Sequence, residues 1–141
     1  MSNRSAVYFS VRGLVKQNNK ILLIHERGGK EHWETPGGSL KPKEPVIQTL
    51  HREMIEELGT DVKVLNKMPF FFHTQYKGNS VLLCYFFVKP LGKLKITKKG
   101  SEEVLAHKYF SKKELLALKK SKKLMIFDAE CLNQLSKILN I

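Results

Sequence analysis

Three glutamates in one short segment are the residues of this sequence best suited to chemistry. Glu53, Glu56 and Glu57 are three and four positions apart, so on an α-helix their carboxylates fall within about a 100° arc of one face. They would lie in the last two turns, where the helix dipole disfavours negative charge. Hard divalent cations take several oxygen ligands and would relieve the repulsion. The spacing therefore predicts a metal site, with a solvated acidic helix face as the alternative.

The helix that would position these glutamates covers residues 45–58. Pro45 suits the first helical turn, and Gly59 suits the position just after the end. The segment has apolar residues at helical spacing, which predicts one packed face: Val46, Ile47, Leu50, Met54 and Leu58. Residues 26–43, before it, are dense in glycine, proline and charge, and predict a loop that carries function.

The remaining segments predict an α/β layered domain, because strands and helices alternate along the chain. Two strand pairs are expected around turn residues: residues 6–17 with 20–25, and residues 61–75 with 80–89. A third strand is expected at residues 107–110. Two helices should follow, at residues 112–120, with Ser111 and Glu114 as a capping box, and within the amphipathic tail at 128–139.

Length and composition limit the kind of protein. The chain has 141 residues and 25 Lys plus Arg against 13 Asp plus Glu, a formal charge of +12, and the length predicts a single domain. Neither a signal peptide nor a membrane span is expected, because the longest apolar run covers only residues 81–88. The two cysteines have no metal-type spacing. These features predict a cytoplasmic protein.

The net charge favours a polyanionic partner. A basic protein suits nucleic acid, an anionic membrane surface or a phosphorylated small substrate. The alternative is a lysine-rich solvated surface that serves solubility. Most of the lysines follow residue 88, whereas Glu44 lies with the three helix glutamates in one short acidic segment.

The sequence around the glutamates resembles the Nudix hydrolase family, of the MutT-like kind. The family motif is G-x5-E-x7-R-E-U-x-E-E-x-G-U, where U is apolar, and it is matched here by Gly38, Glu44, Arg52, Glu53, Glu56, Glu57 and Gly59. Thr60 replaces the last aliphatic residue, which is a packing position. Residues 33–38 resemble the family's W-x-x-P-G-G approach, and residues 101–115 resemble its later strand and helix. The resemblance covers residues 6–116 and implies a Nudix-type α/β/α sandwich with a mixed central sheet, formed by a single domain over residues 1–141.

The resemblance also implies an activity and a site. The family hydrolyses nucleoside diphosphates linked to another moiety and uses Mg²⁺ or Mn²⁺. By position, Glu53, Glu56 and Glu57 would hold the metal, together with a carbonyl at Gly37 or Gly38. Arg52 would orient Glu53 through a bidentate pair. Glu44 would orient the loop or bind a further metal through water.

The general base and the substrate contacts stay open, and a surface position on the strand is the alternative for Arg12. The general base is expected to be Glu53, with Glu103 or Glu102 on a later segment as the alternatives. Substrate contacts are expected from Arg12 on the first strand, Arg27 beside the loop, and Tyr76, which lies where dinucleoside polyphosphate hydrolases of the family carry a tyrosine.

Several substrates remain compatible with the sequence. The leading expectation is a pyrophosphohydrolase acting on nucleoside triphosphates, including damaged ones. Removal of pyrophosphate from RNA 5′ ends, hydrolysis of dinucleoside polyphosphates, and a nucleotide-sensing or nucleic-acid-binding domain without turnover are the alternatives. The expected partners are a nucleotide-type substrate and RNA, without a membrane, and the chain is expected to be a monomer or a homodimer.

Overall fold

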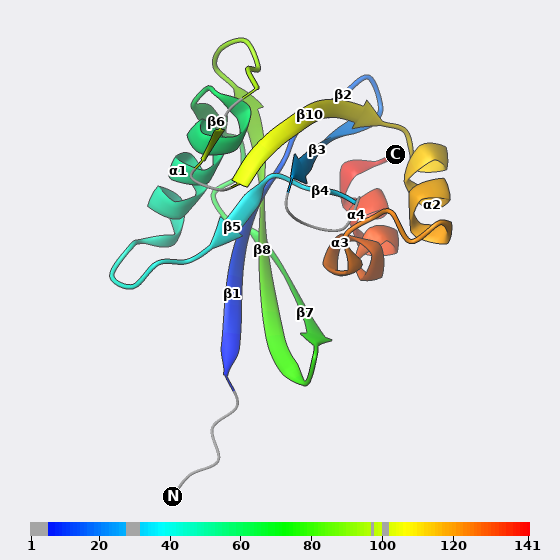
Figure 1. The fold of residues 1–141 in the computed structure, drawn as a ribbon, viewed down its shortest axis with the longest axis horizontal. Helices are drawn as coiled ribbons and strands as arrows, with labels where there is room; N and C mark the ends of the chain where they lie inside the picture. The colour runs from blue at the N-terminus through cyan, green and yellow to red at the C-terminus, as the bar shows by residue number, and fades with distance from the viewer. Residues whose placement is uncertain (1–5, 28–31, 97, 100–101) are drawn as a thin grey trace, which may run out of the picture.

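A computed structural model describes residues 6–27, 32–96, 98–99 and 102–141 (Figure 1). The strands are β1 (Val7–Leu14), β2 (Lys16–Gln17), β3 (Lys20–Arg27), β4 (Trp33–Glu34), β5 (Gly37–Ser39), β6 (Val62–Val64), β7 (Phe70–Tyr76), β8 (Asn79–Pro90), β9 (Lys98–Lys99) and β10 (Glu102–Phe110). The helices are α1 (Val46–Leu58), α2 (Lys112–Lys120), α3 (Ile126–Glu130) and α4 (Leu132–Leu139).

The described strands form two five-stranded sheets. One has the order β5-β1-β8-β6, with β7 also paired to β8, and the other has the order β2-β3-β10-β9, with β4 paired to β3. The β1–β8 pair is parallel and the others are antiparallel. Helix α1 lies on one side of the strands and α2, α3 and α4 lie on the other (Figure 1). The predicted α/β fold with a mixed sheet between helices is confirmed.

The first strand pair is only partly as predicted. Asn18 and Asn19 form the turn with φ of 52° and 58°, but only β2 pairs with β3 across it. Strand β1 belongs to the other sheet, where it pairs in parallel with β8. The reason is burial: residues 11–14 are all buried, and a strand covered on both faces is typical of a central parallel position.

The second predicted strand pair also divides. Strand β7 and the start of β8 form the expected hairpin, with Lys77 and Gly78 at positive φ in the turn. Residues 65–69 leave the sheet, so that β6 pairs separately with the far end of β8. Within this interruption the Asn66 side chain accepts a hydrogen bond from the Phe87 backbone N–H at 2.7 Å, in place of a strand neighbour.

Helix α1 is placed as predicted. Pro45 precedes it as the N-cap, and Gly59 ends it in the left-handed region with φ of 73°. Leu50, Met54 and Leu58 are completely buried against the strands. Ile47 is instead 44% exposed, because side chains tilt toward the helix N-terminus and a first-turn residue points beyond the packed face.

The C-terminal third adds three helices. The capping box of α2 is present: the Glu114 N–H donates to Ser111 Oγ at 3.2 Å, and the Ser111 N–H donates to Glu114 Oε1 at 3.0 Å. The tail predicted as one helix is two, because Cys131 leaves helical geometry between α3 and α4. Among the described residues, no helix combines the length and apolar character that crossing a bilayer requires.

Candidate active site

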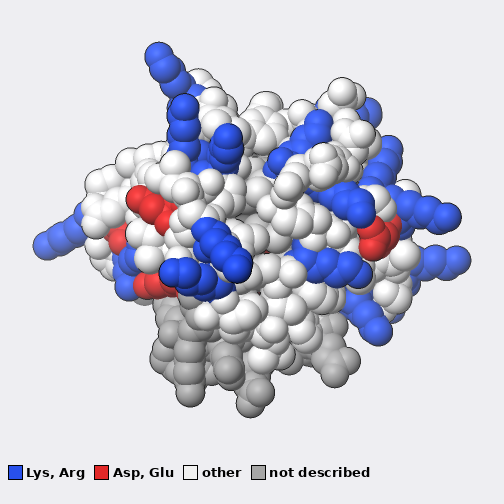
Figure 2. Space-filling model, turned by 90° about the horizontal axis from the view of Figure 1, so that it is seen from above, with Lys and Arg blue, Asp and Glu red and all other residues white. Residues whose placement is uncertain are grey.

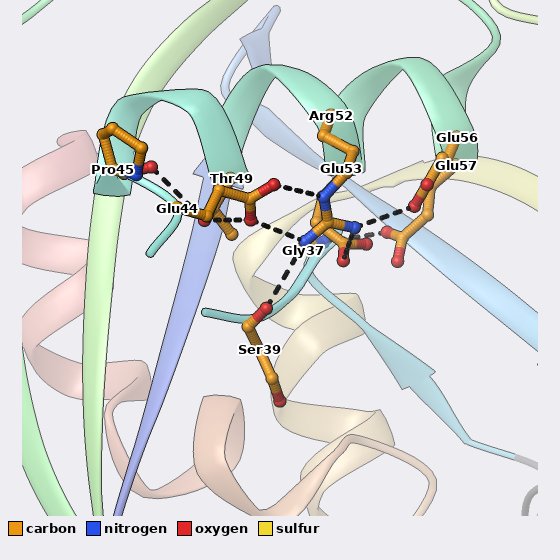
Figure 3. A network of polar contacts seen from close by, with 9 residues as sticks. All are labelled: Gly37, Ser39, Glu44, Pro45, Thr49, Arg52, Glu53, Glu56 and Glu57. Atoms are coloured by element: carbon orange, nitrogen blue, oxygen red, sulfur yellow. Dashed lines mark hydrogen bonds and ion pairs between the residues drawn. The ribbon is translucent and has the colours of Figure 1, made fainter. Parts of the chain in front are cut away.

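The carboxylates of α1 face the glycine loop at β5 (Figure 3). Glu53 and Glu57 are only 4% and 5% exposed, and the Glu56 side chain is 27% exposed. The Gly37 backbone N–H donates to Glu57 Oε2 at 2.8 Å. The structure thus brings together the three glutamates and the two glycines that the sequence predicts as one site.

Arg52 is the cation at the centre of this acidic cluster. Its Nη1 donates to Glu53 Oε1 at 2.8 Å and to Glu56 Oε2 at 3.2 Å (Figure 3). The bidentate partner is Glu44, with Nε–Oε2 at 2.9 Å and Nη2–Oε1 at 3.0 Å. Arg52 therefore contacts Glu53 through one nitrogen, and the predicted bidentate pair is formed with Glu44 instead.

The ion pair changes the proton affinities of both partners. Hydrogen bonds from Arg52 and Thr49 lower the pKa of Glu44 to about 2, against the opposing effect of desolvation. The hydrogen bonds to Glu44 in turn raise the pKa of Arg52, and Glu53 adds to the effect. Glu44 is therefore a fixed anion whose role in the structure is to hold the guanidinium.

Thr49 is a member of the site that the sequence analysis missed. Its Oγ1 donates to Glu44 Oε1 at 2.6 Å and the residue is fully buried. The available signal was a polar residue within the packed face of α1, five positions after Glu44. Thr49 fixes the carboxylate that fixes Arg52.

The two glycines of the loop are required by close contacts. A Cβ at Gly37, whose φ is +150°, would lie 2.1 Å from the Val11 carbonyl oxygen. A Cβ at Gly38 would lie 2.5 Å from Oε1 of Glu53. The missing side chain of Gly37 lets the loop approach β1, and that of Gly38 lets it approach Glu53.

The donor set fits a hard divalent cation in kind and in charge. Carboxylate oxygens are the ligands that such cations take, and three of the four glutamates, Glu44, Glu53 and Glu56, pair with the same arginine, Arg52. Among the described residues, no three acidic, histidine or cysteine side chains are grouped as metal ligands. Arg52 Nη1 contacts both Glu53 and Glu56.

Arg12 is buried below this loop. It is 6% exposed, and it donates from Nε to Thr35 Oγ1 at 2.9 Å, from Nη1 to Ser10 Oγ at 3.1 Å, and from Nη2 to the Thr35 carbonyl. Burial opposes its charge, but Glu34 and Asp128 outweigh burial and raise the pKa of Arg12. The guanidinium is thus a permanent buried cation beside the site.

Asp128 is a second residue that the sequence analysis missed. It is 3% exposed, and its carboxylate accepts hydrogen bonds from Thr35 N at 2.9 Å, from Thr35 Oγ1 at 2.8 Å and from the Tyr85 hydroxyl at 2.7 Å. Burial and this carboxylate raise the pKa of Tyr85 well above its ordinary value. An acid within an amphipathic tail was the only signal in the sequence.

A cavity of about 390 Å³, the site cavity, lies beside the loop. Arg12, Gly38 and Ser39 line it together with aromatic side chains of Tyr8, Tyr76 and Phe127. The Tyr76 and Phe127 rings meet edge to face, with centroids 5.2 Å apart. Two predicted substrate contacts, Arg12 and Tyr76, are therefore brought to one cavity.

Three predicted residues cannot be placed by their side chains. The backbones of Glu103 and Arg27 lie opposite each other in the β10–β3 pairing, and Glu102 is the first residue of β10. The side chains of Arg27, Glu102 and Glu103 lie outside the described part of the structure.

One mixed and one antiparallel sheet, with a helix that turns carboxylates toward a glycine loop, define the class of this protein. The model of the NUDIX domain family matches residues 6–134. The chain belongs to the NUDIX domain family, as the sequence motif predicted.

Two curated relatives carry the same name, 8-oxo-dGTP diphosphatase. The protein of Buchnera aphidicola subsp. Acyrthosiphon pisum is 34% identical over 71 residues, which are 50% of this chain and 55% of the relative. The protein of Proteus vulgaris is 31% identical over 93 residues, which are 63% of this chain and 82% of the relative. The aligned part thus spans about half of the Buchnera protein. A diphosphatase acts on phosphoanhydride bonds, which agrees with the enzyme class predicted here.

Solved structures show the same fold. A NUDIX hydrolase from Nitrosomonas europaea superposes with a TM-score of 0.74 at 23% identity, covering 91% of this chain and 87% of that one. The E. coli ORF135 protein superposes with a TM-score of 0.72 at 25% identity, covering 92% and 88%.

Proposed function

We propose that this protein is a metal-dependent pyrophosphohydrolase that cleaves a phosphoanhydride bond in a nucleoside diphosphate derivative. The observation that carries the proposal is the cluster of Glu53, Glu56 and Glu57 held against the glycine loop by Arg52 and the Gly37 N–H. The three glutamates would hold Mg²⁺ or Mn²⁺, with a loop carbonyl as a further ligand. The metal would neutralise phosphate charge and lower the pKa of an attacking water.

Each group of the chain has its own part in this scheme. Arg52 keeps the carboxylates of Glu53 and Glu56 in place, and Glu44 keeps Arg52 in place. The general base is Glu53, which is buried and lies on the loop side of α1. Glu103 is the second choice for the base.

The site cavity is proposed to take the nucleoside. Its aromatic side chains offer flat surfaces on which a base can stack, and Arg12 is a cation at its wall. The curated relatives are named 8-oxo-dGTP diphosphatases. We therefore propose nucleoside triphosphates, oxidised ones included, as the substrate class, with dinucleoside polyphosphates as the alternative that Tyr76 favours.

The test is metal-dependent turnover of a substrate panel by Glu56→Gln. The panel contains unmodified and oxidised nucleoside triphosphates, dinucleoside polyphosphates, ADP-ribose, nucleotide sugars and triphosphorylated RNA. We expect the variant to lose turnover while its circular dichroism spectrum is unchanged, because the amide cannot serve as an anionic ligand.

Glu130→Gln is the matched control, since Glu130 is an exposed glutamate on α3 that contacts Thr74 rather than the acidic cluster. It should keep wild-type kcat. Wild-type kcat in Glu56→Gln would overturn the metal assignment, and failure of the wild-type protein to cleave any member of the panel would overturn the proposed activity.

RNA 5′ ends are a second candidate substrate because of the basic surface around α2. Six exposed lysines gather on this helix and the turn after it: Lys112, Lys113, Lys119, Lys120, Lys122 and Lys123. If these lysines bind the RNA backbone, the affinity should fall steeply and linearly with salt on logarithmic axes. Hydrolysis of a free nucleotide should respond mildly to the same change.

A further inference from the structure

A second and larger cavity lies away from the acidic cluster. This far cavity has a volume of about 800 Å³, which is within the range of small-molecule binding sites. Leu14 lines it, whereas Tyr8 lines the site cavity. The two cavities have no lining residue in common, although Arg12 of the site cavity lies only two positions before Leu14. None of the glutamates of the acidic cluster lines the far cavity. The far cavity is therefore distinct from the site in which hydrolysis is proposed.

The walls of the far cavity are mainly apolar and come from five parts of the chain. Leu65, Phe87, Leu94 and Tyr109 are among its lining residues. The Leu65 side chain is 57% exposed at the rim. An apolar hollow of this size is open to a ligand with an apolar body.

The charged residues that line the far cavity are both lysines. Lys16 and Lys89 line it, and its lining includes no acidic residue among those described. Lys63 of β6 lies directly opposite Lys89 of β8 in the strand pairing, and like charges in this position repel each other. Neither forms an ion pair with a described acid.

Lys16 adds hydrogen-bond donors to the wall of the far cavity. Its Nζ donates to the carbonyl of Leu139, at the end of α4, at 2.6 Å. An ammonium has three donors, so this bond leaves further donors for a ligand. Figure 2, which looks onto the upper end of the molecule as drawn in Figure 1, shows basic side chains on both sides of a strip of uncharged surface.

We propose that the far cavity binds a small amphipathic anion, with an apolar chain between the cavity walls and a carboxylate at Lys89 and Lys16. The chain would cover Leu65, Leu94 and Phe87. The carboxylate would also relieve the repulsion between Lys63 and Lys89.

The probe is decanoate, used below its critical micelle concentration, and decanol is the uncharged ligand of the same chain length. Binding is measured on the wild-type protein by isothermal titration calorimetry and by amide NMR shifts. We expect one saturable site for decanoate, with the shifts centred on Val15, Lys89 and Tyr109. We expect decanol to bind about fivefold more weakly, the size of effect expected from an exposed ion pair.

Two lysine variants separate a built site from general attraction to a basic protein. Lys89→Glu should weaken decanoate binding by about fivefold or more and leave decanol binding unchanged. Lys120→Glu changes the net charge equally on α2 and should leave both unchanged. Leu65→Ser should weaken both ligands, because it removes apolar contact without touching the cations.

Four outcomes would overturn the proposal. These are the absence of saturable decanoate binding, equal affinity for decanol, an equal loss in Lys120→Glu, and NMR shifts centred on Tyr8, Tyr76 and Phe127 of the site cavity. Light scattering tests a fifth outcome. If the chain is a dimer and Leu65→Ser makes it monomeric, the far cavity is covered by a second copy of the chain and the proposal is wrong.

Discussion

At the scale of single residues, the acidic cluster depends on supports that are themselves fixed. Arg52 bridges two glutamates of the cluster, and Glu44 holds Arg52 with two hydrogen bonds. Gly38 leaves room for the Glu53 carboxylate, which a Cβ would contact at 2.5 Å. Bidentate geometry is available to arginine but not to lysine. The motif therefore specifies the proposed metal ligands and also the side chains that hold these ligands in position.

Glu44 gives this support a pH dependence. The pKa of Glu44 is lowered from 4.5 to about 2. Because the folded state binds this proton less readily than the unfolded state, the stabilisation is fully present above about pH 5 and is lost as the pH falls toward about 2. We expect the unfolding free energy of the wild type to fall over this range more steeply than that of Glu44→Gln, as measured by urea unfolding at a series of pH values.

Glu114→Gln is a suitable comparison, since it changes a glutamate of the α2 capping box and leaves Arg52 unaffected. It should retain the part of the acid dependence that comes from Glu44. Parallel stability curves for the wild type and Glu44→Gln would contradict the assignment of a strongly lowered pKa to Glu44.

At the scale of elements, α3 is tied to the loop that carries the glycines. Asp128 of α3 accepts both the N–H and the hydroxyl of Thr35, and Arg12 of β1 contacts the same threonine. Two positions after Thr35, the Gly37 N–H binds Glu57. A chain of short contacts therefore connects a C-terminal helix to the acidic cluster.

Asp128→Asn tests this connection. Glu34 still pairs with Arg12 in this variant, but the carboxylate that accepts from Thr35 and Tyr85 is lost, and weakening the hydrogen bonds of buried donors costs about 2 kcal/mol. We expect a loss of this size in the unfolding free energy from urea denaturation. Glu130→Gln, an exposed position of the same helix, should change it by less than about 0.5 kcal/mol. An Asp128→Asn variant as stable as the wild type would show that the network does not hold the loop.

The sequence predicted those elements whose signals are local. Helix α1, its stop at Gly59 and the capping box of α2 are set by residues a few positions apart, and all three are confirmed. The parallel pairing of β1 with β8 joins Val7 to Ser80, and no local pattern specifies such a partner. For the same reason Asp128, which is 93 positions from Thr35, was missed, while the glutamates of one helix were found.

At the scale of the whole molecule, the net charge conceals an uneven distribution. Of the 13 acidic residues, four belong to the acidic cluster beside Arg52: Glu44, Glu53, Glu56 and Glu57. Two more, Glu34 and Asp128, lie in the buried network around Arg12. The lysines lie mainly on the outside, as Figure 2 shows for one face. The outer surface is therefore more basic than +12 indicates, which suits an anionic substrate and also makes the folded chain repel itself.

This self-repulsion predicts that NaCl stabilises the protein at neutral pH. Between about 10 mM and about 150 mM salt the Debye length falls from about 30 Å to about 8 Å, which screens lysines from one another but hardly affects the buried Arg12 network. If this screening raises the free energy of unfolding by about 1 kcal/mol, the melting temperature should rise by about 2 to 4 °C for a chain of this length. Differential scanning calorimetry measures the change.

The combined variant Lys119→Glu, Lys120→Glu and Lys122→Glu, which halves the net charge at exposed positions, should melt higher at low salt and respond less to NaCl. A melting temperature that falls with NaCl in the wild type would mean that attractive surface pairs outweigh the lysine repulsion.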